Sequence, residues 1–553
     1  MFLLLVDDLK NFPILQLYFL LILLINTPAT GQHSESFGDQ LIIGIIGKAP
    51  QVINPFVINN FTEKHISRLI YGTGIIQSLD RYGQIINLVE SYIPPKSSRE
   101  QGLKWQYNLR RNIIFHNGRS LRNYDVEFTF DILKKFGGGI INKGYDFSNI
   151  ASINLIGDLE FIFNLKNKDN FFDEKFSDIP ILSRYYYTDL IDDGYEIFKS
   201  NPPLGYGPFQ LESKSEMHIS LVSHKNYVFG EPYLARIVFK FFNNEQQMLD
   251  SFIKGDVDFI EVSTPSTARR LHQILSNRLR VFVTPRPEKK VYFLMFNVNQ
   301  FPFDDTNVRK ALNGAINQGE IAKALLESHG HVALSILDDR NGSFIDRLFS
   351  SSFQPKVSLE SLQKNGWQIN ESKGILAKDG KDFNFELLFE ENSFMEENIA
   401  RSVKIQLAEL GINVQPRPVN FFEKNTLIEE NKFAAIIKDF SYYEDYLYEG
   451  IKAFYFTELR KNDSPLNYSN PTIDRLIKLA DLNPELRKQF IQKFQIELYR
   501  ESPVIFLFFN DEIIYAVNQR FQKVYIPRVN NNRLYYLLNP FENWFVPKSL
   551  QKY

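Results

Sequence analysis

Cysteine is absent from the 553 residues of this chain. That absence excludes disulfide bonds, zinc sites with thiolate ligands and cysteine nucleophiles together. It also excludes a lipidated cysteine as a means of holding the protein at a membrane. An exported form of this chain is therefore expected to be freely soluble, most simply in a periplasm.

A marked excess of charge of either sign is also missing. The chain carries 63 Lys and Arg against 65 Asp and Glu, so no basic field points to nucleic acid. Hydrophobic residues make up 44% and charged residues 23%, which is a globular composition, and the length suffices for two or three domains. The 50 Phe and 27 Tyr mostly fill cores, although rigid aromatic side chains also suit a ligand cleft.

Long apolar runs are scarce. The one clear run, Phe12 to Ile25, is shorter than the roughly 20 residues that a membrane-spanning helix needs. Small residues at Ala29 and Gly31 follow it, as at a signal peptidase site. We interpret 1–31 as a signal peptide that is cleaved after Gly31.

The start of this segment is atypical, because Asp7 and Asp8 outweigh Lys10. Two alternatives therefore stay open: the true start lies elsewhere, or the segment is an uncleaved anchor. An anchored form would suit a binding-domain sensor or signalling partner for a non-peptide ligand.

Strands and helices alternate along the chain. Ile237 to Phe242 reads as a strand, Asn243 or Asn244 can cap a helix, Gly255 ends that helix, and a second strand begins at Val257. Such a β-α-β unit favours a parallel sheet. The same alternation recurs in strands at 291–298, 383–389, 412–414 and 503–509 and in helices at 308–316, 399–410 and 487–499. The fold class is therefore expected to be α/β, with a sheet covered on both faces.

No constellation of residues points to catalysis. The nucleophile elbow G-x-S-x-G, the zinc motif H-E-x-x-H and the phosphate loop G-x-x-x-x-G-K are all missing from the sequence. His329 and His331 lack an evident third ligand nearby, so we interpret them as surface histidines. We expect His116 to hydrogen-bond local backbone. The prediction is a protein that is not an enzyme and holds no metal or other cofactor.

A polar and aromatic cluster follows the strand expected at 433–437. It lies just past the carboxyl end of that strand, where open α/β sheets bind ligands. The cluster is either the wall of a ligand cleft or a surface loop with its tyrosines packed on the domain. The candidate ligand-binding residues are Asp439, Phe440, Ser441, Tyr442, Tyr443, Glu444 and Asp445.

The most informative segment is Trp105 to Phe130. Apolar residues alternate over 105–109 as in a half-buried strand, and an Asn-Gly pair ending at Gly118 marks a turn. Asn123 is then expected to cap a helix whose first turn holds Asp125.

This segment resembles the signature of family 5 of the bacterial extracellular solute-binding proteins, the peptide-binding subunits of ABC importers. The matching positions are Leu109-Arg110, Phe115-His116, Gly118 and Asp125-Val126. Further elements similar to those of the family follow in order: Asn54-Pro55, Gly205-Tyr206-Gly207-Pro208-Phe209, Gly255 with Asp258, Asn297 with Pro302-Phe303, Val308-Arg309-Lys310-Ala311-Leu312, Lys364-Asn365-Gly366-Trp367, and Gly411-Ile412.

The resemblance implies a periplasmic binding protein-like II fold, with two α/β lobes joined by a hinge and an extra domain inserted in the first lobe. Lobe I would comprise 32–75, 205–290 and 515–553, the insert 76–204, and lobe II 291–514. It also implies that a peptide or similar small solute is captured between the lobes by a monomer. The hinge-closed form would then be recognised by the permease of an ABC importer. In such a fold Arg110, Gly118 and Asp125 are expected to be structural.

One departure from the family pattern concerns the ligand. Peptide-binding members carry an acidic residue that pairs with the α-amino group of the peptide, and Tyr442 stands at that position here. The amine anchor is then either missing or supplied by Asp439 or Glu444. A tyrosine there suggests an altered peptide orientation or a non-peptide ligand.

Overall fold

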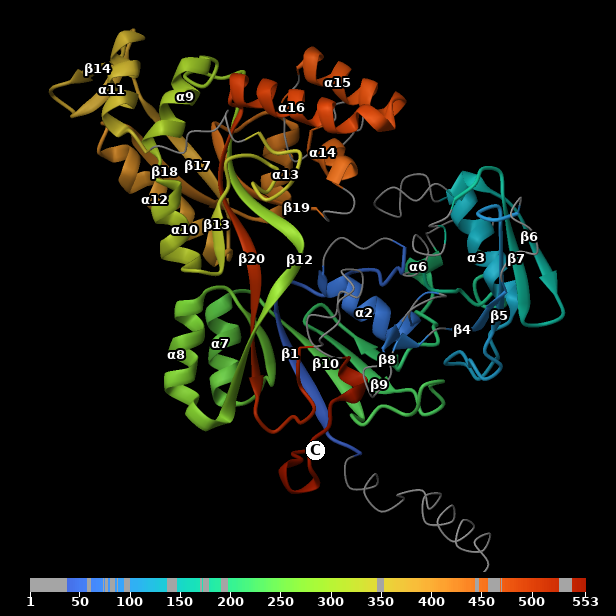
Figure 1. Ribbon diagram of the computed structural model, residues 1–553. Helices are drawn as coiled ribbons and strands as arrows, with labels where there is room; N and C mark the ends of the chain where they lie inside the picture. The colour runs from blue at the N-terminus through green and yellow to red at the C-terminus, as the bar shows by residue number, and fades with distance from the viewer. Residues whose placement is uncertain are drawn as a thin grey trace, which may run out of the picture.

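The computed structural model describes residues 37–56, 61–72, 74, 78–79, 85–86, 88–93, 100–136, 147–169, 172, 179–189, 197–345, 353–442, 447–455, 468, 470–526 and 540–553. Helices and strands alternate in an upper and a lower mass that are joined by a pair of long strands, and a further group of elements from residues 89–165 lies to the side (Figure 1). The expected α/β fold class is confirmed. The segment 1–31 lies outside the described residues, and no helix within them has the length and hydropathy that crossing a bilayer requires.

A single sheet of 11 strands runs through both masses, in the order β18-β17-β19-β12-β20-β11-β1-β10-β9-β8, with β13 beside β20. Its strands are β1 (Gln40–Ile46), β8 (Phe209–Lys214), β9 (His218–Ser223), β10 (Arg236–Phe242), β11 (Phe259–Val262), β12 (Leu279–Phe296), β13 (Gly330–Val332), β17 (Asn384–Glu390), β18 (Asn413–Val419), β19 (Ala435–Tyr442) and β20 (Val504–Asn518).

The buried apolar residues fall into two sets. One set comes from residues 41–279 and 513–546, and we call the part around it lobe I. The other comes from residues 291–509, and we call that part lobe II. The domain limits given above for lobes and insert stay a prediction.

The antiparallel strands β12 and β20 pass from one lobe to the other (Figure 1). Their pairing changes register between Pro285 and Lys290, where the partners are Glu512 and Asn510. Extra residues in one strand of a pair bend and twist it locally. The bend therefore lies where the chain leaves the core of lobe I and enters that of lobe II.

The predicted β-α-β unit is confirmed in lobe I. Helix α7 (Glu245–Lys254) is capped by Asn244, whose side chain accepts from Gln247 N–H, and it ends at Gly255 with φ 85°. Strand β1 lies between β10 and β11 and is parallel to both.

Helices cover both faces of the sheet in lobe II, as expected. Alternate residues of β12 enter different cores: Leu294 packs with α9 to α12 on one face, and Phe293 packs with α14 to α16 on the other. The remaining helices are α2 (Phe61–Tyr71), α3 (Asn123–Phe136), α6 (Ile197–Ser200), α8 (Pro265–Leu275), α9 (Thr306–Ala315), α10 (Gln318–Leu326), α11 (Pro355–Lys364), α12 (Phe394–Ala408), α13 (Phe421–Glu429), α14 (Leu447–Tyr455), α15 (Pro471–Leu482) and α16 (Arg487–Glu501).

Smaller sheets complete the described structure. A four-stranded sheet in the order β4-β5-β7-β6 packs with α3, and its apolar residues join the same cluster as those of β1. The strands of these sheets are β2 (Ser78–Leu79), β3 (Ile85–Ile86), β4 (Val89–Ile93), β5 (Lys104–Leu109), β6 (Ile150–Ile156), β7 (Glu160–Leu165), β14 (Gln368–Asn370), β15 (Ile375–Lys378) and β16 (Lys381–Asp382).

The prediction that the Asn123 side chain caps α3 is wrong. The Asn123 amide donates instead to the carbonyls of Gly157 and Glu160, at 3.0 and 2.7 Å. The Asp125 carboxylate accepts the Arg122 N–H at 2.8 Å. Asn123 thus ties the helix to the β6–β7 turn, and an acid in the first turn takes over at the helix start.

His116 binds backbone as expected, but the backbone is remote rather than local. Its Nε2 lies 3.1 Å from the Gly207 carbonyl, and the Gly205 N–H donates to Nδ1 at 3.4 Å. A Cβ on either glycine would lie 2.1–2.3 Å from a carbonyl oxygen of α2, so only glycine fits there. Burial lowers the pKa of His116 to about 4, so the ring is neutral in the fold.

A buried ion cluster joins the two ends of the chain in lobe I. The Arg520 guanidinium donates to the carboxylates of Asp258 and Asp39, and the Lys552 N–H donates to Asp39 at 3.0 Å. Asp258 belongs to one of the family-like elements, and its role here is to hold β11 against β1 and β20.

We expect Arg520→Met to lower the free energy of unfolding by about 3–5 kcal/mol, because it leaves buried carboxylates without their cation. Urea unfolding at pH 7 measures the change. Arg278→Met, at an exposed arginine, is the matched control and should change stability by less than about 0.5 kcal/mol. Equal effects of the two substitutions would contradict a structural role for the cluster.

We expect the protein to lose stability as the pH falls from about 6.5 to 4, partly because His116 is neutral when folded. The unfolded imidazole has the higher pKa and binds the extra proton over that interval, so acid favours unfolding. His116→Gln should reduce this loss by about 1–3 kcal/mol when urea unfolding at pH 7 and pH 4.5 is compared. His272→Gln, at an exposed histidine, is the matched control for the substitution.

Candidate functional site

Parallel strands of lobe II end together next to the bend. Strand β17 pairs in parallel with both β18 and β19, and the last residues of β19 pair with Lys289 and Lys290 of β12. We call this place the carboxyl edge. It comprises the ends of β17 and β19, Lys289 and Lys290, and the first turns of α12 and α13. Ligands of open α/β sheets bind at such edges.

Strand β19 is longer than predicted. The sequence placed the cluster after a strand ending at Ile437, whereas the strand continues to Tyr442 because β12 pairs with it residue by residue. Asp439, Phe440, Ser441 and Tyr442 are therefore strand residues. Tyr443, Glu444 and Asp445 lie outside the described residues.

Asp439 lies at the carboxyl edge beside a cation. The Lys290 ammonium lies 3.3 Å from its carboxylate, and both side chains are partly exposed. Burial acts to raise the pKa of Asp439, but the charges of Lys290 and Lys424 outweigh it and hold the pKa below its ordinary value. Asp439 is thus a carboxylate at neutral pH, in reach of solvent.

A second ion pair at the carboxyl edge is buried. Lys424 of α13 donates to both carboxylate oxygens of Glu396, each at 2.8 Å, and Glu396 also accepts the N–H of Glu390 at 2.6 Å. Both side chains of this pair are about 95% or more removed from solvent, with exposed fractions of 5% and 3%. The pair locks α12 and α13 to the end of β17.

Tyr442 is buried instead of open to solvent. Its hydroxyl accepts the Asp338 N–H at 3.4 Å, and its ring lies 6.4 Å from that of Phe440. A Cβ at Gly450 of α14 would lie 2.7 Å from the Tyr442 Cβ, so glycine is required there. The Tyr442 side chain therefore contributes to packing and to a hydrogen bond with the Asp338 backbone.

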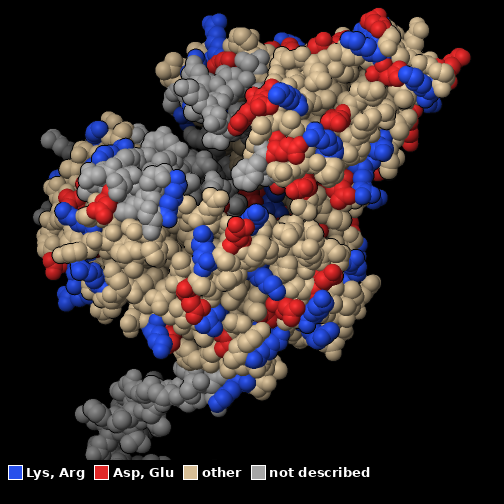
Figure 2. Space-filling model, turned by 180° about the vertical axis from the view of Figure 1, so that it is seen from behind, with Lys and Arg blue, Asp and Glu red and all other residues tan. Residues whose placement is uncertain are grey.

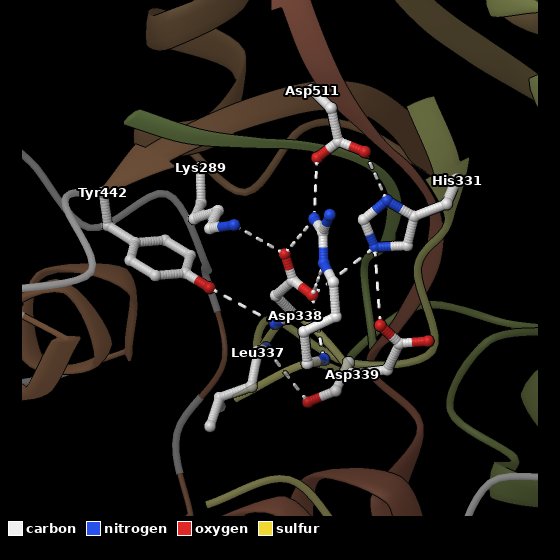
Figure 3. Close-up of polar contacts among 9 residues, drawn as sticks. Lys289, His331, Leu337, Asp338, Asp339, Tyr442 and Asp511 are labelled. Carbon is white, nitrogen blue, oxygen red and sulfur yellow. Dashed lines mark hydrogen bonds and ion pairs between the residues drawn. The ribbon is translucent and has the colours of Figure 1, made fainter. Parts of the chain in front are cut away.

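Tyr442 borders a network around Asp338, shown in Figure 3. The buried Asp338 carboxylate accepts from Lys289 at 2.8 Å and pairs with Arg340. Arg340 also reaches Asp511, which lies at the bend of β20, and Asp511 bonds His331 at 2.6 Å. Burial acts to raise the pKa of Asp338, but its cationic partners hold the pKa well below the usual range.

One metal-ligand set arises from this network among the described residues. Ligand atoms of His331, Asp338 and Asp511 lie within 4.8 Å of one another. The expectation that His331 lacks a third ligand missed both aspartates, which topology brings in from distant segments. The set is, however, already neutralised, since Lys289 and Arg340 occupy Asp338.

Several residues of the site carried only a partial signal in the sequence. Glu396 and Lys424 lie in the first turns of α12 and α13. Lys290 lies within β12, of which the sequence predicted only the apolar part that begins at residue 291. Their meeting depends on which strands neighbour one another. A partial signal existed: each follows the carboxyl end of a strand or lies opposite one.

The family model that matches residues 86–457 is described as bacterial extracellular solute-binding proteins, family 5 Middle. The oligopeptide-binding protein AppA of Bacillus subtilis is 26% identical over 488 residues, which cover 85% of this chain and 86% of the relative.

Solved structures give the same result for the fold. The structure of AppA from Bacillus subtilis in complex with a nonapeptide superposes with a TM-score of 0.68 at 22% identity, covering 93% of this chain and 99% of that one. NikZ from Campylobacter jejuni in complex with Ni(L-His) superposes with a TM-score of 0.71 at 18% identity, covering 92% and 99%.

We expect Lys424→Met to destabilise the protein by about 3 kcal/mol, because Glu396 is left buried without its cation. The double variant Lys424→Met, Glu396→Gln should regain at least half of that loss, since no buried charge remains. Urea unfolding measures both. Arg401→Met breaks the exposed Arg401–Glu397 pair of the same helix and should cost less than about 0.5 kcal/mol. A double variant no more stable than the single one would refute the pairing.

Proposed function

Because the chain belongs to family 5 of the bacterial extracellular solute-binding proteins, we propose that it captures an oligopeptide or a similar small solute between its two lobes and delivers it to the permease of an ABC importer. Members of this family are periplasmic or extracellular binding proteins. The related AppA is named as oligopeptide-binding, which supports a peptide as the solute. The proposal includes the domain limits given above, a monomer, and export by the segment 1–31.

The observation that carries the proposal is the pair β12 and β20. The described chain crosses between the two cores only through these strands, and their register changes at the crossing. Two strands bent at one level form a hinge, about which the lobes can close on a ligand. Seen from behind, the surface is hollowed where the upper and lower masses meet, and acidic and basic side chains are interspersed around it (Figure 2).

One ion pair already spans the two lobes. Arg269 of α8 in lobe I donates two hydrogen bonds, at 2.7 and 2.6 Å, to Glu327, which ends α10 in lobe II. Both side chains are well exposed, so the pair is weak and is easily replaced by water. Such a contact permits repeated opening and closing.

Asp439 is the described residue best placed to receive the cationic end of a solute. It is ionised, partly exposed and at the carboxyl edge, whereas Tyr442 is buried. The amine anchor of the family would then be displaced from Tyr442 to Asp439. If the solute is not a peptide, the same site serves a binding-domain protein for another ligand, which the NikZ complex illustrates within this fold.

The first experiment is native mass spectrometry of the protein purified from its own periplasm, with any bound solute released and identified. A series of short peptides would establish oligopeptide capture. A single non-peptide species would retain the binding role and change the substrate class. Product peptides that accumulate with time would instead reveal an enzyme.

We expect Asp439→Asn to weaken binding of peptides with a free α-amino group by about tenfold or more, because a charge-assisted hydrogen bond is lost. Calorimetric titration with the peptides identified above measures the change. N-acetylated versions of the same peptides should bind the variant and the unmodified protein alike. Loss of affinity for both forms equally would argue against an amine partner.

A further inference from the structure

The charges at the carboxyl edge do not all cancel in pairs. Lys290 is matched by Asp439, and Lys424 by Glu396. Lys438, the residue before Asp439, pairs through its backbone with β12, but its side chain makes no hydrogen bond or ion pair with any residue in the described ranges. One ammonium group therefore remains at this edge without a direct partner there.

The position of Lys438 follows from the strand pairing. Strands β17 and β19 pair only at Leu387↔Ala435 and Leu388↔Ile436. Continuing that register places Lys438 level with Glu390, the last residue of β17, where the two strands no longer pair. Lys438 thus lies opposite the last residue of β17, beyond the point at which β17 and β19 are paired.

Its side chain is partly buried and surrounded by charges from several elements. These are Asp439 on its own strand, Glu390 on β17, Glu396 on α12 and Lys424 on α13. The carboxylates among them are already engaged, by Lys290 and by Lys424. An ammonium group kept from water without a direct counter-ion raises the free energy of the protein alone, and an incoming anion would remove that cost.

We propose that Lys438 binds a carboxylate group of the captured solute. The solute class is then a molecule with a free carboxylate, such as a peptide with an unblocked C-terminus. The side chain of the adjacent Asp439 lies on the opposite face of the sheet, since neighbouring residues of a strand point to opposite faces. The two side chains therefore serve separate ends or groups of one solute. This inference rests on the proposed function and narrows its substrate class.

The titration of Lys438 agrees with this role. Burial and, after it, the nearby charge of Lys424 lower the pKa of Lys438, while Asp439, Glu396 and Glu390 oppose them, and the net result is a pKa of about 8. A bound carboxylate would raise the pKa again, because it favours the charged amine. Binding at pH 8.5 should therefore take up protons from the buffer.

The test uses two probes: an equimolar library of tetrapeptides with free C-termini, and the same library with C-terminal amides. Retention on the full-length protein is measured by native mass spectrometry. We expect the free-acid library to be retained at least tenfold better than the amide library. Equal retention would overturn the role of Lys438 while leaving the proposed function intact. Retention of neither library would overturn both.

Substitutions provide a second test. Lys438→Met should abolish the preference for free acids, and Lys404→Met, at an exposed lysine of α12, should preserve it. Lys438→Met should also melt at a higher temperature than the unmodified protein at pH 7, because it removes a partly buried charge that has no direct partner among the described residues. A lower melting temperature would identify Lys438 as a structural residue and overturn the proposal.

Proton uptake on binding provides a third test. Calorimetric titration of the best-retained free-acid peptide at pH 8.5, in buffers of different ionisation enthalpy, gives the number of protons taken up. The same titration with Lys438→Met corrects for protons exchanged by the peptide itself. We expect greater uptake by the unmodified protein, and no difference between the two would contradict a carboxylate on Lys438.

Discussion

The pairing of β12 with β20 is the constraint on which the rest of the molecule depends. Each of these strands contributes one part to the sheet of lobe I and another part to the sheet of lobe II, so the strands that connect the lobes are also part of both sheets. On one side of the register change between Pro285 and Lys290, β20 places Tyr515 in the core of lobe I, and on the other side it places Phe506 in the core of lobe II. The bend is therefore built into the side-chain pattern of both cores and cannot slide along the strands.

The ion pairs near that bend differ in how far they are buried. The exposed Arg269–Glu327 pair spans the lobes, where a weak contact allows movement, whereas the pair of Glu396 with Lys424 is buried within one lobe and holds its helices in place. The network of Asp338 lies between these extremes, since its carboxylate is buried and its Arg340 partner is exposed. The ion pair between the lobes is thus open to water, whereas the pair of Glu396 with Lys424 within lobe II is shielded from it.

The sequence predicted elements well where one periodicity dominated. The β-α-β unit from residue 237 onward and the capping role of Asn244 are examples, because both depend on local chemistry. The family-like motifs proved to be structural in several places: Arg309 donates to the carbonyls of Phe303 and Ser502, and Gly205 lies against the backbone of α2. Spacing alone cannot separate such residues from ligand contacts.

The site was less predictable, because it depends on contacts between distant segments. Strand β19 was expected to end at Ile437, and only its pairing with β12 extends it to Tyr442. His331 meets Asp338 and Asp511 across a strand crossing that no spacing reveals. Lys438 directly precedes the predicted candidate residues but stood out only after the partners of the neighbouring charges were known.

The ion cluster of Arg520 has a consequence for the order in which the chain folds. The first strand of lobe I is held by residues near the other end of the chain, through Asp39 with Arg520 and Lys552. The core of lobe II, in contrast, comes from one continuous stretch, 291–509. Lobe I cannot be completed until nearly the whole chain has been synthesised, so a chain still being made stays partly unfolded. Contacts of such large sequence separation form slowly, so the closing of lobe I by this cluster is expected to be a late step of folding.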